Sequence, residues 1–326
     1  MTSAGDSIVK TDPIRRLDLS SDLDKIADLI EMCFPIERDP DGQTYIREMR
    51  KAARDMRMLG WLSNLAEMGS SKSAGFVWED SNDIQGNLSL IPFQKDGRRI
   101  HLIANVAVHP DYRRQGIARA LTQHALGYLR RRGDPEAWLQ VRVDNDAAIA
   151  LYQSAGFEKR AIRTTWRIRP VDFTREGAQL KNYFRVRKRD QQDWAQHRAL
   201  LAEAYPFELR WNLPVDFNRL APGLFQKLMN FLDGMRFRHW PFYRQFELRG
   251  VITWQKTSAY ANNLWLAFPP EREAEVLPSA LADVIKRLSR KHPLSVDYPQ
   301  GRAKEVFEEL GFEAFRTLIW MRCSLE

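Results

Sequence analysis

The sequence predicts an α/β protein with two domains of the same design. Strand-like and helix-like segments alternate along the chain, which is typical of α/β folds. Residues 170–182 interrupt this alternation with few apolar side chains and no period, as a connector does. With 326 residues, the chain has the length of about two domains. We therefore expect a first domain at 1–170, a connector at 171–182 and a second domain at 183–326.

The elements of the first half follow from caps and apolar spacing. Ser20, Ser21 and Asp22 form a cap cluster ahead of apolar residues at helical spacing. Short apolar runs between turn residues then indicate strands. The expected helices lie near 23–30, 43–67, 117–131 and 147–154. The expected strands are 13–18, 75–79, 86–92, 100–108 and 137–143, followed by a strand pair near 158–169.

The second half repeats this order of elements. Its expected segments are strands at 183–187, 244–256, 263–268 and 294–298, and helices at 193–204, 276–289 and 303–310. At an offset of 155 residues, the GlyPheGlu at 156–158 matches the GlyPheGlu at 311–313, and Tyr152 matches Phe307. We interpret the chain as a tandem duplication. Chance similarity between two α/β halves is the weaker alternative.

Composition excludes several classes of protein. Hydrophobic residues make up 44% and charged residues 28% of the chain, so disorder as the main state is excluded. No run approaches the ~18 apolar residues of a membrane-spanning helix, and the first residues lack the apolar core of a secretory signal. Two cysteines, Cys33 and Cys323, argue against a disulfide framework and a cysteine zinc site. We expect a cytoplasmic protein without a metal.

The formal net charge is +8, and most of the excess lies in the second half. A basic surface could face nucleic acid or another polyanion. A solvated surface is the simpler interpretation, because net charge alone says little about partners. We expect no membrane and no nucleic-acid partner.

One stretch of the first half, 105–121, combines a strand, a turn and a helix start. Gly116 permits a positive φ at the turn. The amides at the start of the following helix have no partners within the helix, so they can bind an anion such as a pyrophosphate. Arg113, Arg114 and Arg119 add positive charge. A basic surface turn that happens to contain glycine is the alternative.

The segments that follow at fixed spacing make the motif specific. They are LeuGlnValArgValAspAsn at 139–145, AlaAla at 147–148, LeuTyr at 151–152 and GlyPheGlu at 156–158. With the Arg-x-x-Gly-x-Ala turn, this arrangement resembles the GCN5-related N-acetyltransferase (GNAT) superfamily. The segment from strand to helix is similar to the branch that acetylates protein N-termini, including the ribosomal-protein alanine acetyltransferases. The resemblance covers about 12–170 and is tight over 101–158.

The resemblance implies a fold and a co-substrate. Each domain would be a mixed sheet flanked by helices, splayed in the first half between the strand that ends at Val108 and the strand at 138–142. Acetyl-CoA would lie in the split. Its pantetheine arm would bond to the backbone of Val106 and Val108 and contact Asn145. The residues that would hold its pyrophosphate are Arg113, Arg114, Gln115, Gly116, Ile117, Ala118 and Arg119.

The resemblance also places Tyr152 near the thioester sulfur. The leaving thiolate needs a proton, and Tyr152 is the candidate general acid. Helical spacing with Ala148 and Ile149 offers the alternative of a packing residue. The matching Phe307 keeps the ring without the hydroxyl, which favours the acid role in the first half.

No general base can be assigned. Gln140 stands where the branch that acetylates N-termini commonly has a glutamate, and an amide cannot accept a proton at neutral pH. Asn105 and Gln140 could order a water chain for proton transfer. Another group could serve, with Glu79, His101 and His109 as loose candidates, or the acceptor could differ from a peptide N-terminus.

The second half lacks the phosphate-binding turn. ProProGluArgGluAlaGlu at 269–275 replaces it, without glycine and with three glutamates that would repel a pyrophosphate. We expect this degenerate copy not to bind acyl-CoA. The aromatic-rich stretch 205–245 could line an acceptor pocket or a homodimer face, although most of its aromatic residues are expected in the core.

Two functions from different classes follow. The first is an acetyl-CoA-dependent N-acetyltransferase that acts on a primary amine, either a small molecule or a peptide N-terminus. The second is a non-catalytic module that senses acyl-CoA or binds a partner. The tandem layout also resembles mycothiol synthase. In that enzyme the catalytically active domain is the second one, so the order of domains here argues against that assignment. The intact loop, Asn145 and Tyr152 favour the first function.

Overall fold

The computed structural model describes residues 12–62, 75–80, 83–169, 184–186, 189, 191–288 and 292–326. The connector expected at 171–182 lies outside the described residues. The chain forms two compact units. Unit 1 comprises 1–140, 147–158 and 321–326, and unit 2 comprises 141–146 and 159–320. The last residues of the chain thus complete unit 1, and the strand after 158 belongs to unit 2.

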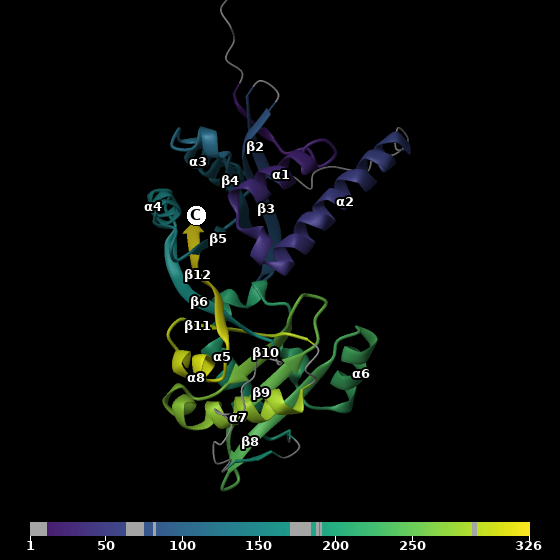
Figure 1. Ribbon diagram of the computed structural model, residues 1–326, viewed down its shortest axis with the longest axis vertical. Helices are drawn as coiled ribbons and strands as arrows, with labels where there is room; N and C mark the ends of the chain where they lie inside the picture. Colours follow the sequence, from purple (N-terminus) through teal and green to yellow (C-terminus); the bar gives the residue numbers. More distant parts are fainter. Residues whose placement is uncertain are drawn as a thin grey trace, which may run out of the picture. The chain divides into compact units, whose positions relative to one another are not determined.

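Unit 1 contains a mixed sheet with the strand order β1-β2-β3-β4-β5-β12 (Figure 1). The pairs β1–β2, β2–β3 and β3–β4 are antiparallel, whereas β5 runs parallel to β4. The strands are β1 (Ile14–Arg16), β2 (Gly75–Asp80), β3 (Asp83–Lys95), β4 (Arg98–Val108), β5 (Glu136–Arg142) and the end of β12 (Glu313–Ser324). The helices are α1 (Leu23–Cys33), α2 (Pro40–Leu62), α3 (Ile117–Arg131) and α4 (Asp146–Ser154).

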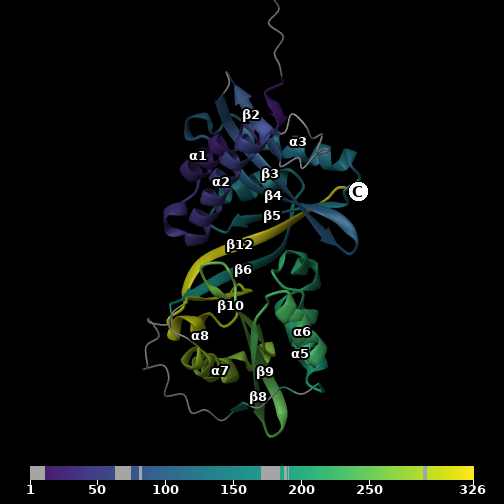
Figure 2. The same cartoon turned by 90° about the vertical axis from the view of Figure 1, so that its right-hand side faces the viewer.

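Alternating side chains of β2 show that helices cover both faces of this sheet. Phe76 packs its ring against His124 and Tyr128 of α3, with ring centroids 4.6 and 5.4 Å away. The next residue, Val77, lies in a buried cluster with Ile26 and Ile30 of α1. Both views place α3 on one side of β2–β4 and α1 and α2 on the other (Figures 1 and 2).

The sheet opens between β4 and β5. Their paired residues run from His101 opposite Ala137 to Ile103 opposite Leu139. Two residues later, Asn105 has a positive φ of 51° and the register of β4 against β3 shifts, which is a β-bulge. The predicted splayed mixed sheet is confirmed, and the bulge marks the start of the split.

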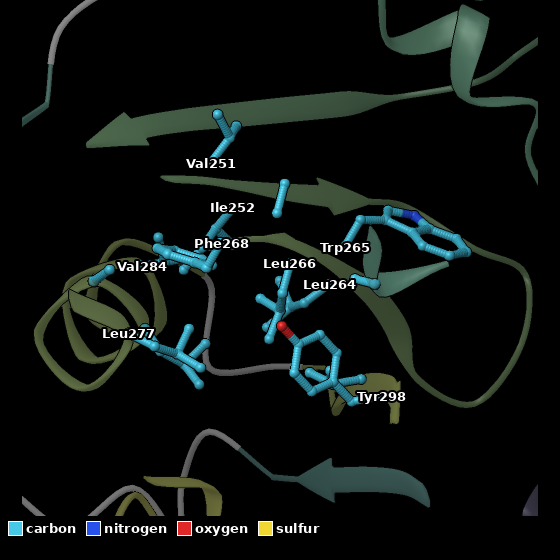
Figure 3. Packing of buried hydrophobic residues seen from close by; sticks show 14 of the residues in the cluster. Val251, Ile252, Leu264, Trp265, Leu266, Phe268, Leu277, Val284 and Tyr298 are labelled. Carbon is cyan, nitrogen blue, oxygen red and sulfur yellow. The ribbon is translucent and has the colours of Figure 1, made fainter. Parts of the chain in front are cut away.

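The strands of unit 2 follow the order β12-β6-β11-β10-β9-β8-β7, in which β10 and β11 are parallel. Its core is a single buried cluster in which Leu277 and Val284 lie beside Phe268 (Figure 3). The further strands are β6 (Glu158–Ile168), β7 (Arg185–Val186), β8 (Phe237–Arg244), β9 (Glu247–Gln255), β10 (Asn262–Ala267) and β11 (Leu294–Pro299). The helices are α5 (Trp194–Ala204), α6 (Leu224–Leu232), α7 (Glu273–Arg287) and α8 (Lys304–Glu309).

Two expected elements are corrected, and two observed elements were not expected. The strand pair near 158–169 is one continuous strand, β6. The strand expected at 244–256 is part of the hairpin of β8 and β9, because the chain turns at Gln245 and Phe246, which both have positive φ. Neither residue carries the glycine or asparagine signal of such a turn. The helix α6 and the strand β12 were not expected.

Candidate functional site

The turn before α3 has the backbone of an anion-binding site. Arg114 and Gly116 have positive φ values of 66° and 84°. The amide of Ala120 bonds to the carbonyl of Gly116 at 2.9 Å, so the amides before Ala120 lie ahead of the helical ladder. The first turn of α3 holds no acidic residue. This exposed helix start therefore suits a phosphate group.

Close packing fixes the helix start against the sheet. Ile117 is buried, and a Cβ added at Gly86 of β3 would lie 2.7 Å from the Ile117 Cγ2. By contrast, a Cβ at Gly116 would meet no atom within 4 Å. Gly86 thus permits close approach of α3, whereas Gly116 is required for its φ.

The structure brings the predicted loop residues, Arg113 to Arg119, together at this helix start. Arg113, Arg114, Gln115 and Arg119 are exposed. The Arg113 Nε donates to the Val108 carbonyl at 3.2 Å, which ties this arginine to the end of β4. Positive charge surrounds the free amides, and the predicted cradle is physically consistent with an anionic ligand.

The end of β4 offers backbone groups away from β3. The His109 amide bonds to the Gln85 carbonyl at 2.8 Å. Alternation along an antiparallel pair then turns the N–H and C=O of Val108, and those of Val106 before it, away from β3. The Val108 carbonyl accepts from the Cys33 thiol at 3.3 Å as well as from Arg113.

Tyr152 lies on α4 and is 7% exposed. Its ring meets Phe157 edge to face, with centroids 6.0 Å apart. Among the described residues, its hydroxyl has no hydrogen-bond partner. Burial raises the pKa of Tyr152 to about 12, so the hydroxyl keeps its proton at neutral pH.

The loose candidates for a base each have another contact. Glu79 binds Arg15 at 2.6 Å, and this contact lowers the pKa of the carboxyl. His101 is buried 3.5 Å from Asp134, and burial lowers the pKa of the imidazole. The His109 ring accepts from the Asp111 amide at 3.4 Å. A general base stays unassigned.

Gln140 and Asn145, two further predicted residues, lie in different units. Gln140 is exposed on β5, directly after the last residue of that strand paired with β4. Asn145 is exposed in unit 2, and its amide bonds to the Arg142 carbonyl at 3.1 Å. The pyrophosphate loop belongs to unit 1.

Asn105 lies in a polar cluster that sequence reasoning missed. Its Nδ2 donates to the Tyr45 hydroxyl at 2.7 Å and contacts the Ser89 Oγ at 3.4 Å. Tyr45 lies on α2, and no local sequence pattern indicates that it contacts Asn105. Asn87, fully buried in the apolar strand β3, was the available signal, because a buried amide requires partners.

The start of α7 in unit 2 has different chemistry. Glu273, its first residue, is buried, and its carboxylate accepts from the Tyr298 hydroxyl and from Arg302. Glu275 follows in the same turn and pairs with Arg244. Two carboxylates therefore stand where α3 has none.

Among the described residues, no group of three or more His, Cys, Asp or Glu side chains could hold a metal ion. In the same part of the chain, no helix combines the length and apolar character needed to cross a membrane.

Comparison with known proteins identifies the family. Residues 23–157 match the model of the Acetyltransferase (GNAT) family. The [ribosomal protein bS18]-alanine N-acetyltransferase of Escherichia coli (strain K12) is 52% identical over 62 residues, which are 19% of this chain and 42% of that protein. The matched segment thus spans less than half of this relative. Residues 23–157 therefore form a domain of the GNAT family.

Solved structures agree on the fold of the whole chain. A GCN5-related N-acetyltransferase from Sphaerobacter thermophilus aligns with a TM-score of 0.56 at 15% identity, covering 96% of this chain and 95% of that one. A tandem GNAT protein from the clavulanic acid biosynthesis pathway aligns with a TM-score of 0.51 at 15% identity, covering 96% and 98%. The expected tandem architecture is confirmed.

Proposed function

We propose that the protein is an N-acetyltransferase that transfers an acetyl group from acetyl-CoA to a primary amine. The exposed, acid-free start of α3 with its positive-φ turn carries this proposal. In functional terms, residues 1–170 are the catalytic domain, and 183–326 are a degenerate domain without the phosphate loop. A cytoplasmic location fits this use of acetyl-CoA.

The residues of the loop fit the donor. The free amides of α3 and the exposed arginines would hold the pyrophosphate, and the outward backbone groups of Val106 and Val108 would hold the pantetheine arm. Asn145 is proposed as a further contact to that arm. When bound, acetyl-CoA supplies an acetyl group activated as a thioester.

Tyr152 is the proposed general acid. Because burial raises the pKa of Tyr152 to about 12, its hydroxyl is protonated at neutral pH but is a weaker acid than a free tyrosine. The proposed role is that this hydroxyl gives its proton to the thiolate as the amine displaces it. A packing role alone would not explain the missing partner of the hydroxyl, since a phenylalanine would serve equally well. Asn105 and Gln140 are proposed to order water that accepts the proton of the amine.

The acceptor is proposed as a peptide N-terminus or a small primary amine. Likeness to the bS18-alanine N-acetyltransferase favours the peptide. Gln140 favours a different acceptor, because the glutamate expected there is absent. The alternative function is a non-catalytic acyl-CoA sensor, and the lack of an assigned base is the observation in its favour.

The test is CoA release from acetyl-CoA across amines, polyamines, amino acids and short peptides. We expect turnover on at least one acceptor class, and a fall of at least ~10-fold in kcat for Tyr152→Phe, about 1.4 kcal/mol of barrier. Tyr128→Phe is the matched control, because Tyr128 is 8% exposed and contacts Arg132. Binding of acetyl-CoA without turnover on any amine would favour the sensor.

A further inference from the structure

A polar cluster of Tyr45, Asn87, Ser89 and Asn105 surrounds the bulge of β4. We call it the bulge cluster. The Asn105 Nδ2 lies 2.7 Å from the Tyr45 hydroxyl and 3.4 Å from the Ser89 Oγ. The Asn87 Nδ2 donates to the Asn105 carbonyl at 2.8 Å. Helix α2 and strands β3 and β4 thus converge on one amide side chain.

The backbone at the cluster is held in an uncommon conformation. Asn105 has a φ of 51°, a region that non-glycine residues seldom adopt, although asparagine tolerates it best. Asn87 is fully buried, and its Oδ1 has no partner among the described residues. An unpaired buried acceptor destabilises the fold. Such costs concentrate at functional sites, where they fix a geometry that the chemistry needs.

The cluster leaves one group of Asn105 available. Its amide nitrogen donates to Tyr45 and Ser89, whereas its Oδ1 has no partner in the described part of the chain. This oxygen is also not among the fully buried, unpaired atoms. Asn105 is two residues past the last β4–β5 pair, so this residue lies where the sheet begins to split.

We propose that the Asn105 Oδ1 accepts a hydrogen bond from the attacking primary amine, and that Tyr45 and Ser89 orient the amide for this contact. The inference rests on the proposed acetyl transfer and names a group that binds the acceptor. An N–H donor is the ligand chemistry that an unpaired amide oxygen selects. Tyr45 is then a positioning residue, because it acts only through Asn105.

The test compares acceptor kinetics in three variants. Asn105→Gly removes the amide and keeps the positive φ, so the bulge is retained. Tyr45→Phe removes only the orienting hydroxyl. One hydrogen bond is worth about 0.5–1.5 kcal/mol, so we expect kcat/KM for the amine to fall about 3- to 10-fold in Asn105→Gly and less in Tyr45→Phe. The KM for acetyl-CoA should stay within ~2-fold.

The double variant separates positioning from general damage. Because Tyr45 acts through Asn105, Tyr45→Phe should cause no further loss in the Asn105→Gly background. Tyr260→Phe in unit 2 is the control, since Tyr260 is 41% exposed and Tyr45 is 45% exposed. If the losses of the two single variants multiply in the double variant, or if Asn105→Gly leaves the acceptor kinetics unchanged, the role of Asn105 is wrong while the proposed function still stands. A wild-type protein that acetylates no amine would overturn it together with the proposed function.

Discussion

The helix starts of α3 and α7 differ in whether the chain places its own carboxylates in the first turn. Both helices have 15 residues, and each follows a strand and a short 3-10 turn. At α3, glycine and exposed arginines surround free amides. At α7, the buried Glu273 carboxylate occupies the first turn and is bound by Tyr298 and Arg302.

This difference indicates that the helix dipole alone does not make a phosphate site. A helix start attracts negative charge in either unit. In unit 2 the chain itself supplies that charge, and a second anion would meet Glu273 and Glu275. In unit 1 the first turn holds no acidic residue, and we propose that a ligand supplies the charge. The two helix starts therefore make opposite predictions for equivalent changes.

The largest expected effect is that of Gly116→Asp. A side chain at a φ of 84° is strained by about 1–2 kcal/mol, and the carboxylate would repel a pyrophosphate. We expect the Kd for acetyl-CoA, measured by calorimetry, to rise about 30- to 100-fold. Gly97→Asp is the matched control, because Gly97 also has a positive φ and open space around it. Equal losses in both variants would contradict a local role for Gly116.

The next effect concerns the filled helix start. Glu273→Gln removes a buried charge that Tyr298 and Arg302 bind, and we expect the free energy of unfolding to fall by about 2 kcal/mol. Glu275→Gln should cost less than ~0.5 kcal/mol, because that pair is solvent-exposed. The side chains of Glu273 and Glu275 are 7% and 54% exposed. Denaturant unfolding measures both. Equal costs would show that Glu273 is not a structural anion.

A smaller effect is expected from single arginines of the loop. Arg119→Ala removes one cation from the first turn of α3, and we expect about 5-fold weaker binding of acetyl-CoA at low salt. The difference should shrink as salt rises, since exposed charges are screened. Arg131→Ala, at the other end of the same helix, is the control and should leave the Kd unchanged. A salt-independent difference would argue against an electrostatic role.

The smallest expected effect is that of Gln140→Glu. It introduces a carboxylate on exposed β5 next to the split, where a base is missing. The test substrate is a short peptide with the sequence of a ribosomal-protein N-terminus. If the missing base limits peptide acetylation, kcat/KM for this peptide should rise about 3-fold at neutral pH. Gln123→Glu on α3 is the exposed control. No change for any peptide would remove the base explanation.

The sequence predicted most of the elements that build the site. The spacing of apolar residues predicted α3 at its observed bounds, because a cap glycine and a regular apolar face define such a helix locally. The hairpin of β8 and β9 was missed, since its turn at Gln245 and Phe246 carries no local signal. Strand β6 belongs to unit 2 and the end of β12 belongs to unit 1. This division depends on long-range strand pairing, which no local sequence pattern indicates.

The candidate site divides in the same way. The residues of the pyrophosphate loop are contiguous in sequence, so their spacing was sufficient to group them. The spacing could not group the partners of Asn105 in this way. Tyr45 lies 60 residues earlier, on a helix that only tertiary packing brings to β4. Nor could spacing show the contact between Glu273 and Tyr298 that fills the start of α7.

Calorimetric titration of the full chain with acetyl-CoA tests the comparison of the two helix starts most directly. Our account predicts one acetyl-CoA bound per chain, with a Kd that is about 30- to 100-fold higher in Gly116→Asp and unchanged in Glu275→Gln. Two molecules bound per chain, or one that persists at unchanged affinity in Gly116→Asp, would contradict it.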